Sequence, residues 1–312
     1  MPAQTGIPAN GIIQGLVDNP AKFAINTVAS SHPGLALDRF LPFSFQTERL
    51  RDDPPDWAFW KFDSKDRGPW LRQFAKKVSD TYHQAKTKQN GWYAWAKRYQ
   101  EMIRAWEKQG DAKCITLRPR WRWIIGLGNQ TVLETGITLH HTYGIPYLPG
   151  SALKGMTQAL VELELESNTQ KTKLDQLGQL LLSRGNSDAR KCAIEAIFGT
   201  QNKAGTQKKA GEIIFLDGIP SPDGDPPKLT VDIMTPHFSK YYSGQRANPL
   251  EVEDPTPIPF LVVNGGHYQI TVAKRHPTVS NPLLELASEL CVSALDEIGI
   301  GGKTAKGYGY FV

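Results

Sequence analysis

The end of the chain combines glycine and lysine in a way that suits the binding of an anion. The run from Ile298 to Val312 holds five glycines and two lysines, has no acidic residue and ends in aromatic side chains. Glycines let backbone N–H groups approach a ligand closely, and lysines add positive charge. Gly301, Gly302, Lys303 and Lys306 are therefore candidate phosphate ligands. The run lacks the G-x-x-x-x-G-K-[ST] spacing of a P-loop and follows an apolar helix rather than a strand, so we expect no ATP site.

A second candidate anion site lies at the start of a predicted helix. Ser151 follows Pro149-Gly150 and is a natural N-cap, and apolar residues recur after it at helical spacing. This start would present backbone donors and Lys154 at a helix N-terminus, which attracts anions. A capped turn without any ligand would have the same sequence, so both interpretations stay open.

Three arginines alternate with apolar residues in a predicted strand from Cys114 to Leu127. Arg118, Arg120 and Arg122 would form a row on one face of that strand, with tryptophan and isoleucine on the other. A row of cations on a strand needs solvent or an anion beside it. Surface exposure alone would satisfy this need. The row is therefore a candidate phosphate contact, and a solvated row without a ligand is the alternative.

Catalytic chemistry has few candidates. The segment from Gly128 to Gly150 contains Glu134, His140 and His141 but no aspartate. Histidine can act as a general acid or base, so a ribonuclease that uses these three residues is the alternative interpretation. Adjacent residues of an extended chain point to opposite sides, however, and would not straddle one phosphate. We therefore expect no catalytic residues, no metal site and no cofactor; no G-x-S-x-G hydrolase motif occurs either.

The distribution of charge points to a polyanionic partner. The chain of 312 residues has a net charge of +5, yet the segment from Lys61 to Arg122 carries 16 Lys or Arg against 6 Asp or Glu. Tryptophans are interleaved with these cations, at positions 70, 92, 95, 106, 121 and 123. Nucleic acid is the default partner for such a segment, and aromatic rings can stack on bases. A solvated helical face and a small aromatic core would explain the same residues.

Composition places the chain in an intracellular setting. The three cysteines, Cys114, Cys192 and Cys291, are odd in number and far apart, which is typical of reduced thiols in a cytoplasmic protein. No apolar run is long enough to span a membrane, and the first residues do not resemble a signal peptide. We therefore expect a cytoplasmic protein with no membrane partner.

The order of predicted elements indicates an α+β fold. An irregular arm over residues 1–69 and a basic helical region, Trp70–Lys86 and Trp92–Lys108, ended by Gly110, make up a first part, 1–112. Residues 113–312 read as strand, helix, strand, strand, helix, strand, which is the ferredoxin-like order. The remaining predicted elements are helices Lys171–Leu182, Asp188–Phe198 and Pro282–Ile298, strands Glu212–Asp217, Leu229–Met234 and Tyr308–Val312, a hairpin of Pro259–Val263 with Tyr268–Ala273, and an insertion near 218–257 whose long part is Pro236–Pro257.

Several of these segments together resemble the RAMP superfamily, the repeat-associated mysterious proteins of CRISPR systems. The resemblance rests on Tyr147–Gly155, which is similar to the signature that opens the first helix, on Ile197-Phe198-Gly199, and on the terminal Gly299–Tyr310 loop. Leu133–Tyr147 and Val231–Tyr242 look like the sixth RAMP subunit of Cmr (type III-B) effector complexes.

The resemblance implies a ferredoxin-like fold and a place in an RNA-guided antiviral ribonucleoprotein. It implies a backbone subunit at the 3′ end of the crRNA, in contact with crRNA and target RNA, a repeating RAMP backbone subunit and a small helical subunit. RAMP subunits that cut RNA use an aspartate in the loop before the first helix, which is absent here, so a non-catalytic role is implied. The RNA-binding residues would be Ser151, Lys154, Gly301, Gly302, Lys303, Lys306, Arg118, Arg120 and Arg122.

Overall fold

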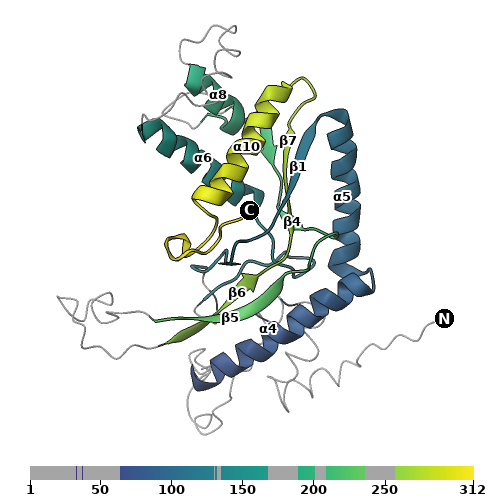
Figure 1. Cartoon of the computed structure of the whole chain (residues 1–312), viewed down its shortest axis with the longest axis vertical. Coiled ribbons are helices and arrows are strands. Elements are labelled where there is room, and N and C mark those ends of the chain that lie inside the picture. The colour runs from purple at the N-terminus through teal and green to yellow at the C-terminus, as the bar shows by residue number, and fades with distance from the viewer. Residues whose placement is uncertain are drawn as a thin grey trace, which may run out of the picture. The chain divides into compact units, whose positions relative to one another are not determined.

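The computed structural model describes residues 33, 37, 64–129, 131, 135–167, 189–200, 209–235 and 257–312 (Figure 1). The chain forms two compact units built from interleaved segments. Unit 1 comprises Met1–Thr81, Gly128–Ile145 and Lys228–Val262, and unit 2 comprises Tyr82–Leu127, Pro146–Pro227 and Val263–Val312. The predicted helix Lys171–Leu182, the arm before residue 64 apart from residues 33 and 37, and the insertion 236–256 lie outside the described residues.

A four-stranded antiparallel sheet is the centre of unit 2. Its order is β1 (Ala112–Leu117), β7 (Tyr268–Lys274) and β3 (Ile213–Phe215), with β4 (Ile219–Pro220) also paired to β7. The register of β1 on β7 runs from Ala112 opposite Ala273 to Leu117 opposite Tyr268. Six of the seven residues of β7 are buried, as the central strand of a covered sheet requires.

The C-terminal segment completes this sheet order. Residues 310–312 pair with residues 118–120, which directly follow β1, through a bridge between Pro119 and Phe311. In the sheet the chain end therefore lies beside β1, then β7, then β3. Helices follow β1 and β7 in the sequence. Together with this strand order, they confirm the predicted α+β, ferredoxin-like fold.

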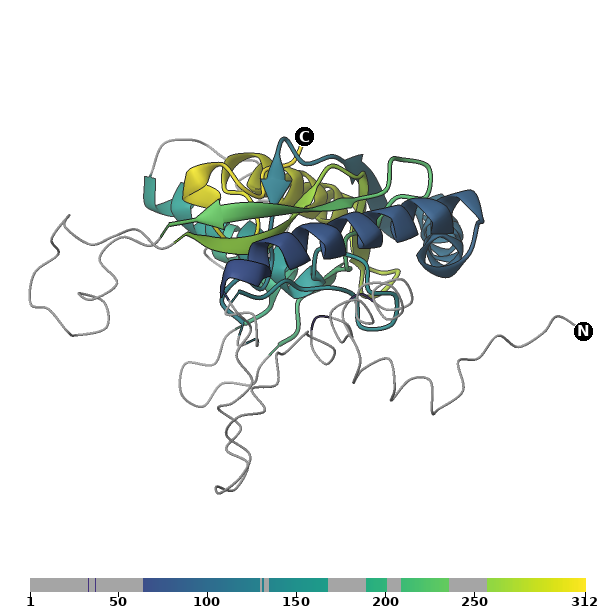
Figure 2. The ribbon, with the colours of Figure 1, turned by 90° about the horizontal axis from the view of Figure 1, so that it is seen from below.

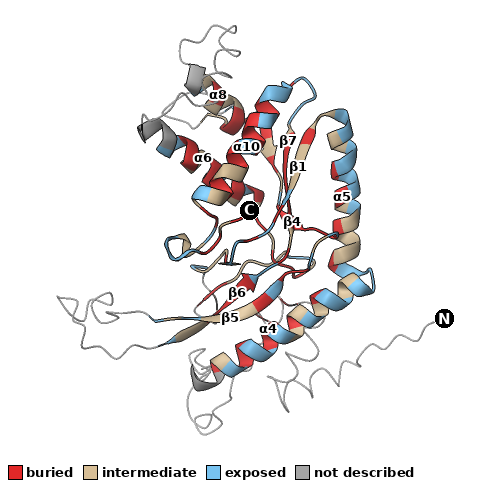
Figure 3. Cartoon of the chain, viewed as in Figure 1, coloured by how far each residue is buried: buried red, intermediate tan, exposed pale blue. Residues whose placement is uncertain are grey.

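Helices cover both faces of the sheet. α6 (Gly150–Ser167), α8 (Ala189–Phe198) and α10 (Asn281–Glu297) pack together, and α10 lies on β1 and β7, while α5 (Gly91–Gln109) packs on β1 from the other side (Figures 1 and 3). α10 buries Leu283, Leu286, Leu290 and Ala294 at helical spacing. Gly110 ends α5 with a φ of 77°, as the sequence predicted.

Unit 1 holds the first part of a long helix, one strand and most of a second strand. The helix, α4 (Ser64–Thr87), begins earlier than predicted and contains Pro69 near its start. β5 (Lys228–Met234) and β6 (Ile258–Asn264) run side by side (Figure 2). Ser79 ties the helix to β5, because its Oγ accepts a hydrogen bond from Leu229 N at 2.9 Å.

The predicted strand from Cys114 to Leu127 is wrong in its length. β1 ends at Leu117, and a separate β2 (Arg122–Trp123) pairs with the end of β6, Arg122 opposite Asn264. Pro119 stands between them and has no N–H to donate to a neighbouring strand. The three arginines therefore do not share one regular strand.

The predicted hairpin of residues 259–263 and 268–273 is also wrong. β6 belongs to the three-stranded sheet β2-β6-β5 and β7 to the four-stranded sheet. The backbone groups that would close a hairpin are used elsewhere: Asn264 pairs with Arg122, and His267 exchanges hydrogen bonds with Ser221 and Asp225. The turn between the strands therefore carries the chain from one sheet to the other.

A candidate nucleic-acid interface

The terminal glycine-rich loop requires glycine at two positions, because its backbone there lies too close to other backbone atoms to leave room for a Cβ. Gly301 and Gly309 have φ values of 88° and 80°. A Cβ added to Gly301 would stand 2.1 Å from the carbonyl oxygen of Ile124, and one on Gly309 would stand 2.0 Å from that of Ile300. These distances are far shorter than real contacts, so glycine is required where the loop backbone lies against Ile124 and where Gly309 lies against Ile300 within the loop.

Hydrogen bonds dock the loop onto the arginine row. Gly302 N donates to Ile124 O at 2.8 Å, and Gly309 N donates to Arg122 O at 2.9 Å. Arg118 and Val312 exchange two hydrogen bonds, and Arg120 N donates to Tyr310 O at 2.8 Å. Two separate sequence predictions, the Gly/Lys loop and the arginine row, thus meet in one place. We call this place the Arg–Gly surface, defined by Arg118, Arg120, Arg122, Gly301, Gly302, Lys303 and Lys306.

The Arg–Gly surface is strongly cationic. Arg118, Arg120 and Lys306 are exposed, and Arg122 and Lys303 are half-buried. Arg120 forms an ion pair with Asp296 of α10, and both side chains remain about half exposed, at 49% and 44%. The exposed cations Arg118, Arg120 and Lys306 present positive charge that suits a run of phosphates.

An exposed tryptophan stands within this surface and was not among the predicted site residues. Trp121 is 47% exposed, whereas Trp123 is fully buried against Tyr268 and Phe311. The sequence pattern placed both rings on one apolar face. They separate because Trp121 lies before β2, outside the regular alternation of that strand.

The start of α6 does not present the open anion site that Ser151 suggested. Gly150 N donates to the Asp217 carboxylate at 2.7 Å, so the protein's own anion already occupies the helix N-terminus. A Cβ on Gly150 would lie 2.2 Å from Phe215 O, which explains the glycine by close packing. Ser151 itself is exposed. Its assignment to RNA binding stays a prediction.

Lys154 joins two of the motifs that the sequence singled out. Its Nζ donates to Phe198 O at 2.8 Å, at the C-terminal end of α8. A cation there meets carbonyl groups without helical partners and the negative end of the helix dipole. The ammonium group thus has a structural partner, and contact with RNA remains a prediction for this residue.

The histidine pair lies in unit 1, in a turn that His140 helps to stabilise. His140 Nδ1 accepts hydrogen bonds from the backbone N–H groups of Thr142 at 3.2 Å and Tyr143 at 3.4 Å. His141 is exposed. Glu134 lies outside the described residues. Within the described ranges, no three His, Cys, Asp or Glu side chains are grouped as a metal site would need.

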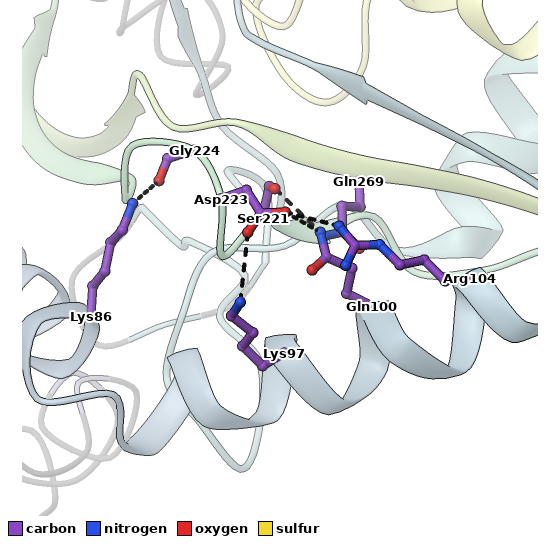
Figure 4. Close-up of polar contacts among 8 residues, drawn as sticks. All are labelled: Lys86, Lys97, Gln100, Arg104, Ser221, Asp223, Gly224 and Gln269. Carbon is purple, nitrogen blue, oxygen red and sulfur yellow. Dashed lines mark hydrogen bonds and ion pairs between the residues drawn. The ribbon is translucent and has the colours of Figure 1, made fainter.

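A polar cavity of about 550 Å³ lies in unit 2 between α5, β1, β7 and the loop 221–225. Asp223 accepts hydrogen bonds from Gln100 Nε2 at 2.6 Å and from an Arg104 NH2 group at 3.2 Å, and lies 3.8 Å from Lys97 (Figure 4). Lys86 donates to Gly224 O nearby. Glu107, Asp223 and Asp225 outnumber Lys86 and Arg104 in the lining, so the cavity suits a phosphate poorly.

Two of the cysteine thiols, Cys114 and Cys291, are not activated as nucleophiles. Burial raises the pKa of the Cys114 thiol, and it raises the pKa of Cys291 to about 11. A raised pKa keeps the reactive thiolate scarce at neutral pH. These cysteines therefore support no covalent chemistry.

Among the helices that the structure describes, none has the length and apolarity needed to cross a membrane.

Comparison with known proteins gives the geometry a family context. Residues 120–312 match the sequence model of the RAMP superfamily. The chain is 36% identical over 225 residues to CRISPR system Cmr subunit Cmr6 of Pyrococcus furiosus. That match spans 61% of this chain and 65% of the length of the relative.

Two solved structures are similar in part. The crystal structure of Cmr6 from Pyrococcus furiosus is 33% identical, covers 64% of this chain and 98% of that chain, and superposes with a TM-score of 0.36. A chain of a CRISPR RNA-guided surveillance complex in a pre-nicking state is 10% identical and covers 64% of this chain and 76% of that chain, with a TM-score of 0.35.

Proposed function

The chain belongs to the RAMP superfamily, and we propose that it is a non-catalytic, crRNA-binding backbone subunit of a type III-B CRISPR effector complex, at the 3′ end of the guide. The observation that carries the proposal is the Arg–Gly surface, in which the glycine-rich loop and three arginines meet. The similarity to Cmr6 of Pyrococcus furiosus supports the choice of complex. The proposed partners are crRNA, target RNA, a repeating RAMP backbone subunit and a small helical subunit.

The surface would hold the RNA through its phosphates. Arginine forks make bidentate contacts with phosphate oxygens, and lysines add point charges. Such contacts position a strand but carry no sequence information. Base pairing between guide and target would then read sequence, as in other RNA-guided complexes.

The geometry of the histidines supports a non-catalytic role. His140 Nδ1 already accepts two backbone hydrogen bonds, so this ring nitrogen is committed to the turn. The alternative ribonuclease would use His140, His141 and Glu134 as acid and base. Since a general acid and base must flank the scissile phosphate, two neighbouring histidines with one ring committed to a turn are poorly suited to it.

A salt series on single-stranded RNA tests the proposal. We expect log affinity to fall linearly with log salt concentration, by about 0.7 per phosphate contact, and Arg118→Ala or Lys306→Ala to reduce that slope by about 0.7 each. Lys113→Ala is the matched control. In the wild type, the Lys113 ammonium pairs with Glu285 of α10 at 3.7 Å and lies outside the Arg–Gly surface. An affinity independent of salt would refute the phosphate-holding role.

A further inference from the structure

Trp121 is exposed although most described tryptophans are not. Trp70, Trp92 and Trp123 are at most 5% exposed, while Trp121 is 47% exposed. Among the described residues, the other large apolar side chains that are exposed, Met102, Leu163, Ile233 and Val312, are not aromatic. Tryptophan is largely buried on average, so an exposed ring inside a basic surface is a candidate ligand contact.

The backbone on both sides of Trp121 is fixed. Arg120 N donates to Tyr310 O, and Arg122 O accepts from Gly309 N. The ring also packs against Tyr308, a buried side chain, with ring centroids 4.9 Å apart and planes inclined by 57°. The indole is therefore held in position before any ligand arrives. This reduces the loss of side-chain entropy on binding.

The charges around the ring match an aromatic group that carries phosphates. The guanidinium carbon of Arg122 lies over one face of the Trp121 ring, 5.1 Å from its centre, so a base would stack on the part of the indole that remains exposed. Arg118 and Arg120 stand exposed on the same segment, and Lys306 is exposed on the docked loop. A nucleobase offers a face to the indole, while its flanking phosphates offer charge to the cations.

We propose that Trp121 is a stacking platform for one unpaired nucleobase of the guide RNA, with Arg118, Arg120 and Lys306 holding the adjoining phosphates. The inference rests on the proposed function and adds an aromatic subsite to it. An unpaired base is required because, inside a duplex, both faces of each base are covered by its neighbours. Sequence-tolerant stacking of this kind is general in single-strand binding.

The test compares the full-length chain with Trp121→Ala, Trp121→Phe and Arg118→Ala. The probes are a single-stranded oligoribonucleotide, the same oligomer with abasic nucleotides, and an RNA duplex of equal length. We expect Trp121→Ala to weaken single-strand binding about 5- to 100-fold with an unchanged salt slope, and Trp121→Phe to retain most of the affinity. Neither variant should change binding of the abasic strand or the duplex.

The outcomes separate the inference from the function on which it rests. If Trp121→Ala binds the single strand as the wild type does while Arg118→Ala binds more weakly, stacking is refuted and phosphate binding stands. If Trp121→Ala binds RNA normally but fails to join the other subunits, the ring is a protein contact and the inference is wrong. If the wild-type chain binds no RNA, the proposed function itself fails.

Wild-type protein alone supplies a second measurement that does not depend on the folding of any variant. It should bind the base-bearing strand more tightly than the abasic strand. Equal affinity for the two strands would overturn the stacking subsite.

Discussion

At the scale of single residues, Asp296 would compete with RNA for Arg120 of the Arg–Gly surface. Its carboxylate pairs with Arg120, and both groups are about half exposed. An RNA phosphate must therefore compete with this carboxylate for the guanidinium. We predict that Asp296→Asn tightens RNA binding about two- to five-fold, as the loss of a partly exposed ion pair allows, measured by filter binding at low salt.

The control for this prediction is Glu285→Gln. It removes one negative charge from the same helix, but its partner is Lys113 at 3.7 Å, outside the Arg–Gly surface. If both variants tighten binding equally, the effect comes from net charge alone and Arg120 has no special part in RNA contact.

Lys154 offers a second residue-scale prediction. Its hydrogen bond to Phe198 O fastens α6 to the end of α8. We expect Lys154→Met, which keeps the aliphatic stem, to destabilise the fold by about 1.5–3 kcal/mol, the value of a hydrogen bond to a charged group. Denaturant unfolding measures this. A variant with unchanged stability but weaker RNA binding would instead return Lys154 to the RNA-binding set.

At the scale of elements, the terminal loop depends on glycine for two separable reasons. Gly301 and Gly307 have nearly the same φ, 88° and 87°, but a Cβ on Gly307 meets nothing within 4 Å. Gly307→Ala should therefore cost only the left-handed strain, about 1–2 kcal/mol. Gly301→Ala adds a clash with Ile124 O and should lower both thermal stability and RNA affinity further. Equal losses in the two variants would mean that close packing of the loop is unimportant.

Local patterns predicted most elements but not how strands pair. α5 with its Gly110 end, α8, α10 and β5 lie where periodicity and turn residues placed them. The segment after β1 was misread because alternation continued through Pro119 to Trp123. The hairpin was misread because the partners of Asn264 and His267 are distant in sequence. Pairing over such separations is a tertiary property that no local window contains.

The candidate site shows the same division. The sequence identified candidate phosphate ligands in the glycines and lysines of the terminal loop and in the three arginines. The structure brings these residues together. The carboxylate of Asp217 at the start of α6 was not visible, because it comes from a loop 67 residues away. The sequence did not distinguish Trp121 from the buried tryptophans, because composition does not show which ring becomes exposed where a strand is interrupted.

At the scale of the whole chain, the helix before β1 is part of the same compact unit as the sheet. Gln269 and Thr271 of β7 are buried on the face that carries Cys114 and Thr116 of β1. Through Gln100 and Arg104, α5 also holds Asp223 of the loop beside β4. A sheet with two polar residues buried on one face needs a cover there. The predicted division of the chain between residues 112 and 113 stays a prediction.

The proposed non-catalytic role gives the last prediction. General acid–base catalysis by a histidine contributes about 10²- to 10⁴-fold to a rate. We expect His140→Asn and His141→Ala to leave single-turnover cleavage of target RNA within about two-fold of wild type at every site, because neither ring transfers a proton in the reaction. Asparagine keeps an acceptor for the N–H groups of Thr142 and Tyr143, so His140→Asn separates loss of the imidazole from loss of the turn. His140→Ala, which removes both, should lower stability without removing any cleavage site. Loss of one cleavage site in His140→Asn, with assembly and guide binding intact, would make this chain a nuclease.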